Sequence, residues 1–284
     1  MDKIGFYLFS KKHGKKNIGS SRIRGHWLID KWKGAEELKY ATKYDVIIYQ
    51  KVYETQLART VKEDSDTIQI LDLCDPDWLT NQPIVEMIEE VDAVTCSSKG
   101  LYDFLKGVTD KPVKLIEDRV NIDEIPPPKE HKGKAKMAVW FGYSHNDSVI
   151  HPVLHHLHKA GLRLRIVSNS AYMPQNDKFI DTVDWVMWEN SKQADKAIQE
   201  ADFAVLPASN DPKFRYKSPN KTYHCWALGL PVAHNLPQLQ KYILGEEREK
   251  ESKKRLKQVK EELTTETSVT EYKELIDEVK SRVR

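Results

Sequence analysis

The chain has 284 residues and a mass of 33.0 kDa, enough for two domains of ordinary size. It is 39% hydrophobic and 31% charged, as globular proteins are, and no apolar run approaches the roughly 20 residues of a membrane-spanning helix. The net charge is only +2, but residues 1–34 carry nine Lys or Arg against two Asp, a local excess of +7. The composition excludes a membrane-spanning protein and favours an anionic partner near the N-terminus.

The N-terminus, MDKIGFYLF, is typical of a buried strand and too short in its apolar part for the core of a signal peptide. Cys74, Cys96 and Cys225 stand singly in apolar surroundings without CxxC spacing. We therefore expect buried thiols rather than disulfides or a zinc site. The expected location is the cytoplasm or the surface of a membrane.

Short apolar runs alternate with amphipathic segments through the first 120 residues. Strands are predicted at residues 4–9, 44–50, 67–73, 91–97 and 113–118, and helices at 21–32, 54–61, 83–89 and 99–106. Ser97 or Ser98 can cap the last of these helices. This alternation is typical of a doubly wound parallel sheet.

The proline-rich and charged stretch EIPPPKEHKGKAK interrupts the alternation and predicts a linker at residues 126–135. The pattern then resumes, with strands at 137–142, 162–170, 183–188, 202–209 and 230–235 and helices at 148–161, 191–201 and 218–229. We predict an α/β protein of two Rossmann-like domains, residues 1–125 and 136–265, that face each other across a cleft. A last helix in residues 266–284 carries an apolar face and is expected to pack back on the first domain.

The segment KSPNKTYHCWALGLPVAHN, residues 217–235, is expected to start a helix at the carboxyl end of a strand. Ser218 and Pro219 suit a helix start, and Gly229 suits its end. Arg215, Lys217 and Lys221 have no such structural reason, because a helix N-terminus disfavours cations. A bound diphosphate would neutralise them.

The same segment resembles the signature of GT-B glycosyltransferases of the glycogen-synthase-like family 4, Lys-(x)2-Glu-(x)4-Gly-x-Pro-Val-Val. Lys221, Gly229, Pro231 and Val232 match it. His224 stands where the family has a glutamate on the donor ribose, and the family's preceding glutamate would fall on Tyr216. The resemblance extends in weaker form over nearly the whole chain and implies a GT-B fold and a nucleotide-sugar donor, UDP- or GDP-linked.

Donor contacts are implied at several further positions. VWFGYSHND resembles the family's phosphate turn, with Gly142 and Ser144 close to the donor phosphates and His145 as an added donor. Trp188 follows a strand where the nucleotide base is held in the family, although burial in the core is the commoner role of tryptophan. Asn220, in the first turn of the donor helix, completes the predicted donor set.

No metal is expected at the donor site, because the helix dipole and cations can replace it. His151 and His155 lie four residues apart in HPVLHHLH, but no carboxylate or cysteine completes a ligand set there.

The acceptor side is predicted in the first domain. GSSRIRG resembles the family's glycine-rich loop, which makes Ser21, Arg22 and Arg24 candidates for acceptor or phosphate contacts. In ILDLCDPDW, Asp75 is the best candidate for the base that an inverting enzyme needs, whereas Asp77 equally suits turn formation. A retaining enzyme would need no such base.

Two classes of function stay open at this point. The first is transfer of a sugar to an acceptor hydroxyl, with an anionic acceptor such as a modified DNA base or a lipid-linked carrier. The second is a non-catalytic nucleotide-sugar-binding or scaffold protein on the same fold. The second alternative stays open because His224 and Tyr216 stand where the family has glutamates.

Overall fold

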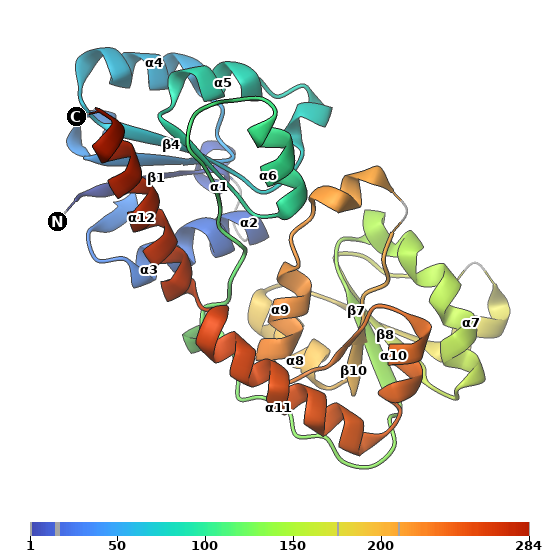
Figure 1. Ribbon diagram of the computed structural model, residues 1–284. Helices are drawn as coiled ribbons and strands as arrows, with labels where there is room; N and C mark the ends of the chain where they lie inside the picture. The colour runs from blue at the N-terminus through green and yellow to red at the C-terminus, as the bar shows by residue number, and fades with distance from the viewer. Residues whose placement is uncertain (1, 15–17, 175, 210, 284) are drawn as a thin grey trace. The chain divides into compact units, whose positions relative to one another are not determined.

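The computed structural model describes residues 2–14, 18–174, 176–209 and 211–283. The chain divides into two compact units (Figure 1). Unit 1 contains residues 1–121, 212–220 and 264–284, and unit 2 contains residues 122–211 and 221–263. The chain therefore passes between the units at four places along the sequence, and segments distant in sequence complete each core.

Unit 1 is built on a six-stranded parallel sheet with the order β2-β1-β3-β4-β5-β6. Its strands are β1 Ile4–Leu8, β2 Ala35–Glu37, β3 Val46–Gln50, β4 Ile68–Leu73, β5 Ala93–Cys96 and β6 Val113–Leu115. Its helices are α1 Phe9–Lys12, α2 Gly19–Ser21, α3 Trp27–Lys31, α4 Thr55–Asp64, α5 Ile84–Glu90, α6 Lys99–Lys106 and α12 Thr265–Val283. Short 3-10 turns lie at Ala41–Lys43, Asp77–Thr80 and Pro212–Tyr216.

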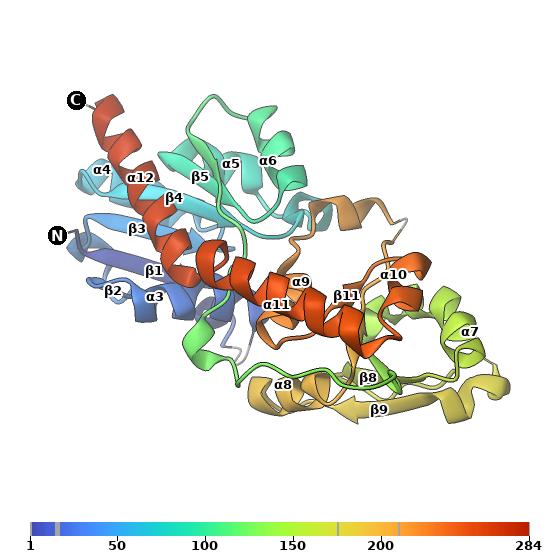
Figure 2. The same cartoon turned by 60° about the horizontal axis from the view of Figure 1, so that its bottom comes forward.

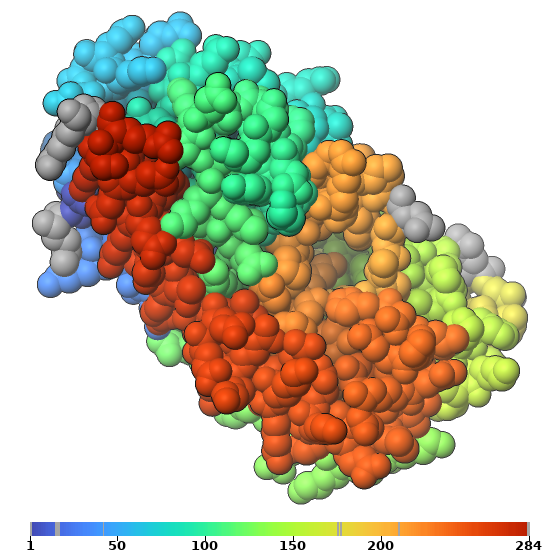
Figure 3. All heavy atoms as spheres, in the orientation of Figure 1, coloured from blue at the N-terminus to red at the C-terminus, as the bar shows by residue number. Residues whose placement is uncertain are grey.

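Successive residues of each strand point to opposite faces of this sheet, so that a separate hydrophobic core forms on each face. Ile47 and Tyr49 pack with α4, α5 and α6 on one face. Val46 and Ile48 pack with α3 and α12 on the other face. Figure 2 shows α12 beside α3 along the sheet, and in Figure 3 its outer side, in dark red, forms part of the surface of unit 1.

Unit 2 is built on a five-stranded parallel sheet with the order β11-β10-β7-β8-β9. Its strands are β7 Met137–Phe141, β8 Arg163–Ser168, β9 Val183–Met187, β10 Phe203–Val205 and β11 Val232–Ala233. Its helices are α7 His151–Lys159, α8 Ser191–Gln199, α9 Asn220–Ala227, α10 Leu236–Lys241 and α11 Gly245–Glu262, with 3-10 turns at Ile122–Glu124, Ser144–Ile150 and Asp177–Thr182. Helices α7 and α10 pack on one face of the sheet, and α8 and α9 pack on the other.

Residues 126–135, predicted as a solvated linker, pack along unit 2 instead. The Lys129 N–H donates to the Leu228 carbonyl at 3.0 Å, and the buried His131 ring contacts the Gly229 carbonyl at 2.7 Å. A Cβ on Gly245 would approach the Gly133 carbonyl to 2.4 Å. The proline-rich and charged segment is thus held against unit 2 by hydrogen bonds and close backbone packing.

Local differences from the predicted elements have physical reasons. The predicted helix 21–32 contains a π-helical turn, Arg22–His26, between α2 and α3. Ser98 caps α6 as expected, accepting from the Leu101 N–H at 3.3 Å. Ser218 does not act as the predicted cap, because α9 begins at Asn220 and the Ser218 hydroxyl donates to Asp118. Strand β2 and helix α10 were not predicted.

The last helix buries the expected apolar face. Val269, Tyr272, Leu275, Ile276 and Val279 are each at most 5% exposed and belong to the core shared with α3. Residues 212–220, which the sequence placed in the second domain, are counted with unit 1. The reason is visible in Tyr216, which lies in the unit 1 core and accepts from the Ser98 hydroxyl through its carbonyl at 2.8 Å.

Candidate functional site

The strand order of unit 2 reverses between β7 and β10, because β8 and β9 lie on one side of β7 and β10 and β11 lie on the other. In open α/β sheets, ligands bind beyond the carboxyl ends of the strands at such a reversal. Gly142 follows β7 at this point, with a φ of +156°. The predicted phosphate turn therefore occupies the position that the topology favours for a ligand.

Lys221, in the first turn of α9, reaches the same place. Its ammonium lies 5.1 Å from the ring centre of Trp140 and 5.6 Å from that of Phe141. A Cβ built on Gly142 would come within 2.4 Å of the Lys221 Nζ and 3.1 Å of Trp140. The missing side chain at 142 is thus what lets this cation lie against the backbone at the end of β7.

Aromatic side chains gather at the adjoining strand ends. The exposed Tyr143 ring stacks on His145 with centroids 5.8 Å apart and meets the half-buried Trp188 ring edge-on at 5.5 Å. The Ser144 N–H, predicted to face phosphate, donates to the Asn169 side chain at 2.8 Å. Tyr143, which was not predicted as a site residue, therefore contacts both His145 and Trp188.

His224 forms a close pair with Asp195, a buried residue of α8. The Nε2 of His224 lies 2.6 Å from the Asp195 Oδ1, and the two side chains are 14% and 9% exposed. Asp195 was not identified from the sequence, because it lies 29 residues away on another helix. The pairing fixes one ring nitrogen of the histidine that replaces the family glutamate.

In unit 1 the strand order reverses between β1 and β3. Lys51 follows β3 at this point with a φ of +54°, an uncommon conformation for a lysine. Its ammonium lies 2.7 Å from Asp75 and 3.4 Å from Asp77, and 5.3 Å from the Phe9 ring centre. Lys51 was not predicted from the sequence, although its place directly after a buried strand could have indicated it.

The two aspartates at this edge have opposite surroundings. Lys51 donates to Asp75 Oδ2, and Lys217 donates to Asp75 Oδ1. Burial alone would raise the pKa of Asp75, but these two ammonium groups lower it overall. For Asp77, burial outweighs Lys51 and the Tyr53 hydroxyl, which donates to its Oδ2 at 2.6 Å, so its pKa is raised.

The cations expected to bind a diphosphate have different surroundings. Lys217 is paired with Asp75, and the Arg215 guanidinium lies over the Tyr216 ring at 4.5 Å and donates to its hydroxyl. Both belong to unit 1, as does Asn220, whereas Lys221 belongs to unit 2. Local partners therefore account for Arg215 and Lys217 without a bound diphosphate.

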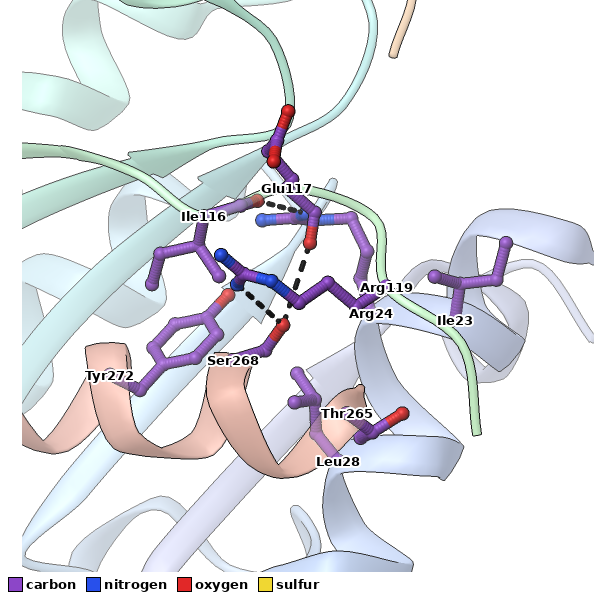
Figure 4. Close-up of a pocket in the computed structure, with 9 residues that line it drawn as sticks. All are labelled: Ile23, Arg24, Leu28, Ile116, Glu117, Arg119, Thr265, Ser268 and Tyr272. Atoms are coloured by element: carbon purple, nitrogen blue, oxygen red, sulfur yellow. Dashed lines mark hydrogen bonds between the residues drawn. The ribbon is translucent and has the colours of Figure 1, made fainter. Parts of the chain in front are cut away.

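Two of the residues predicted to contact the acceptor, Ser21 and Arg24, have buried side chains. Arg24 is 2% exposed and forms ion pairs with Asp72 and Asp118, while the Tyr272 hydroxyl donates to Asp72 at 2.9 Å (Figure 4 shows Arg24 and Tyr272). Burial lowers the pKa of Arg24, but Asp72, Tyr272 and Asp118 outweigh it and hold that pKa well above its ordinary value. The Ser21 hydroxyl is fully buried and donates to Gln50 at 2.8 Å. Their positions indicate a structural role.

The cavity drawn in Figure 4 lies beside Arg24, between the π-helical turn Arg22–His26 with α3, the chain after β6, and α12. Its volume is about 10 Å³, too small for a sugar or nucleotide. It therefore belongs to the packing of α12 and does not extend the candidate site.

Arg22 differs from its neighbours on the π-helical turn. Its guanidinium lies 5.3 Å from the Trp27 ring centre, and within the described part of the chain its buried Nε has no hydrogen-bond partner. An unsatisfied charged donor is costly unless a ligand or solvent completes it. Of the three predicted acceptor residues, Arg22 is the one that the structure leaves able to contact an anion.

The described residues contain no group of three or more His, Cys, Asp or Glu side chains arranged to hold a metal ion. Within the same residues, no helix has both the length and the apolarity needed to cross a membrane. Cys74, Cys96 and Cys225 are buried free thiols.

The sequence matches no protein-family model and no curated protein. Solved structures, however, match nearly the whole chain. A glycosyltransferase from Rickettsia africae has a TM-score of 0.63 at 9% identity, covering 97% of both chains. The lipopolysaccharide outer core galactosyltransferase WaaB has a TM-score of 0.61 at 11% identity, covering 97% of this chain and 99% of its own. The protein has the GT-B fold.

A third GT-B structure, HepE from Anabaena in complex with UDP-glucose, has a TM-score of 0.56 at 11% identity over 99% of this chain and 100% of its own. The expected fold class, two Rossmann-like parallel sheets with helices, is thereby confirmed. The GT-B assignment explains why the reversal points of the two sheets, at Gly142 and at Lys51, are the places to look for bound ligands.

Proposed function

We propose that this GT-B protein transfers a sugar from a UDP- or GDP-linked donor to an acceptor hydroxyl. The observation that carries the proposal is the Lys221 ammonium beside Gly142 at the reversal point of the unit 2 sheet. Phosphate oxygens need close approach to backbone and a compensating cation, and this pair supplies both. The fold shared with HepE, which was solved with UDP-glucose, supports the same class of donor.

The nucleotide base and ribose would contact side chains around this point. Trp188 and Tyr143 offer aromatic faces at the ends of β9 and β7 for a base to stack on. His224, with Nε2 held by Asp195, presents its other ring nitrogen for a hydroxyl. The diphosphate would need no metal, since Lys221 and the N–H groups at the start of α9 provide the positive field.

The first experiment measures UDP and GDP binding by calorimetry. Replacing a charged hydrogen-bond donor costs about 1.5–3 kcal/mol, so Lys221→Gln should weaken diphosphate binding roughly 10- to 100-fold. Lys192→Gln, on the exposed start of α8, is the matched control and should bind as the wild type does. Equal affinity of all three proteins would refute the donor site, and loss of affinity on adding EDTA would refute metal independence.

The acceptor, in our proposal, carries an anionic group that Arg22 contacts. Its Nε, which has no hydrogen-bond partner within residues 2–14, 18–174, 176–209 and 211–283, and the excess of basic residues in the first 34 positions support this. Binding to single-stranded DNA and to vesicles with anionic lipid, each at low salt, separates the two sources of such a group. Arg22→Gln should weaken whichever interaction is found, and absence of both would refute an anionic acceptor.

Turnover separates an enzyme from a binding protein on the same fold. Release of UDP or GDP from the corresponding sugar nucleotides should accompany binding. Saturable binding without any release would favour the non-catalytic alternative.

A further inference from the structure

Helix α11 of unit 2 has an uneven distribution of charge around its axis. Its sequence is nearly neutral, with seven basic and six acidic residues. Between positions 250 and 260, however, every exposed residue is a lysine. These residues, which we call the lysine face, are Lys250, Lys253, Lys254, Lys257 and Lys260. In Figure 3 the outer side of α11, in orange-red, lies on the surface of unit 2. A helix that is balanced in sequence therefore presents a basic surface.

The two arginines of α11 have partners inside unit 2. Arg248 is fully buried and donates to the Tyr242 carbonyl at 2.8 Å. Arg255 lies 4.2 Å from the Trp226 ring centre and donates to Glu251 at 2.7 Å. These contacts turn both guanidinium groups away from the outer surface, so the lysines set its charge.

The lysine face is only weakly neutralised by acidic residues of the same helix. Lys253 lies 3.1 Å from Glu249 and Lys257 lies 3.8 Å from Glu261, but the two lysine side chains are 75% and 74% exposed. Ion pairs with this exposure contribute little free energy and exchange readily with other anions. The other three lysines of the face form no ion pair with any residue in the described ranges.

An open groove lies along the same side of α11. Its volume is about 330 Å³, which is in the range of small-ligand pockets. The groove is lined by Lys253, Leu256, Lys257, Lys260 and Glu261. Leu256 is half-buried, so three ammonium groups surround an apolar side chain. This combination suits an amphiphile with an anionic headgroup.

The composition of the lysine face favours a membrane surface over a nucleic acid. Positions 250–260, all of which the structure describes, expose no arginine to pair with a phosphodiester and no aromatic side chain on which a base could stack. Clusters of about four to eight basic residues on a helix are attracted to anionic lipid headgroups. From Lys250 to Lys260 the face is about 15 Å long, at about 1.5 Å per residue, so it can contact several headgroups at once.

We propose that the lysine face of α11 docks on a membrane surface that carries anionic lipid headgroups. The ammonium groups contact the headgroup phosphates, while the helix stays packed on unit 2 through its buried side. The docking is electrostatic and reversible. It does not depend on the proposed sugar transfer, nor on Arg22, which belongs to unit 1.

Sedimentation of the full chain with lipid vesicles at about 0.1 M salt tests the docking. The wild type should bind vesicles of phosphatidylcholine with phosphatidylglycerol and should not bind phosphatidylcholine alone. Each basic residue near an anionic surface strengthens binding roughly fivefold, so K253Q/K257Q/K260Q should bind roughly 100-fold more weakly. The same loss is expected in the Arg22→Gln background, because contacts of separate surfaces act independently.

The matched control removes the same net charge from exposed positions on α7 and α8. This variant, K159Q/K192Q/K196Q, should bind the vesicles much as the wild type does. Equal losses in the two triple variants would show that only net charge matters and would overturn the assignment to α11. Glutamine has nearly the helix propensity of lysine, and urea unfolding checks that both variants are folded.

The remaining outcomes are also decisive. A wild type that binds neither kind of vesicle, or both equally, overturns the proposal. So does retention on the anionic vesicles at about 1 M salt, where electrostatic attraction is screened, and this measurement needs no variant. Binding of single-stranded DNA through the same lysines, without binding of vesicles, would assign the face to nucleic acid instead. UDP affinity should be unchanged in K253Q/K257Q/K260Q, so a failure of the donor site and a failure of the docking are distinguishable.

Discussion

Arg24 donates to both oxygens of Asp72, at 2.5 and 2.8 Å, and the two side chains are 3% and 0% exposed. Asp118 receives a further bond from the same guanidinium at 2.8 Å. The sequence context of Arg24 suggested a phosphate ligand, but in the structure Arg24 links the π-helical turn Arg22–His26 to β4 and to the chain after β6.

Arg24→Gln should therefore unfold the protein more easily rather than weaken anion binding alone. Removing one partner of a buried ion pair costs about 3–5 kcal/mol, because the remaining charges stay buried. Urea unfolding measures the loss. Lys33→Gln, at an exposed position, should change the free energy of unfolding by less than about 0.5 kcal/mol. A loss of similar size in both variants would contradict the structural role of Arg24.

Gly142→Ala should damage the donor site specifically. The new Cβ would meet the Lys221 ammonium at 2.4 Å and Trp140 at 3.1 Å, so the lysine must move away from the end of β7. Gly161→Ala is the control, since Gly161 also has a positive φ, +68°, but nothing within 4 Å of a Cβ. Both variants should lose about 1 kcal/mol of stability from backbone strain, and only Gly142→Ala should lose UDP affinity.

The Asp195–His224 pair should show strong energetic coupling. Its 2.6 Å contact is largely shielded from solvent, so a double-mutant cycle with Asp195→Asn and His224→Ala should give about 1–3 kcal/mol in urea unfolding. The exposed pair Lys253–Glu249 on α11 is the comparison and should give less than about 0.5 kcal/mol. Coupling no greater in the buried pair would show that the imidazole is not held by Asp195.

His131 should make unit 2 less stable as pH falls. Burial lowers its pKa below the ordinary 6.5, and in the neutral ring Nε2 donates to the Gly229 carbonyl while Nδ1 accepts from Arg248. The unfolded chain takes up the proton first, so the stability contributed by neutral His131 is complete above pH 6.5 and is lost as the pH falls below it. Urea unfolding at pH 7.5 and 5.5 should show a larger loss in the wild type than in His131→Gln. His155→Gln, at an exposed position, should keep the wild-type dependence.

Much of the fold could be predicted because strong local patterns coincide with the strands. Runs such as VIIYQ and IQILDL are buried on both faces, which gives a continuous apolar signal. Strand β2, Ala35–Glu37, lacks that signal, since it lies at the sheet edge and is held by pairing with β1. The segment 212–220 gave no sign that it would join unit 1, because that depends on the fit of Tyr216 into a core whose other buried residues lie between Leu38 and Leu105.

In the candidate site, too, some features could be predicted from the sequence and others depend on tertiary contacts. The sequence by itself determined the two-sheet architecture, the glycine at the end of β7 and the lysine in the first turn of α9, because these follow from periodicity, turn chemistry and motif spacing. Only the tertiary structure decided that Arg24 is buried against Asp72, that the Arg22 Nε has no hydrogen-bond partner among the described residues, and that Lys51 and Lys217 both donate to Asp75. The physical reason is that the charge state and availability of a side chain depend on its neighbours in space, and those neighbours come from strands and helices far apart along the chain.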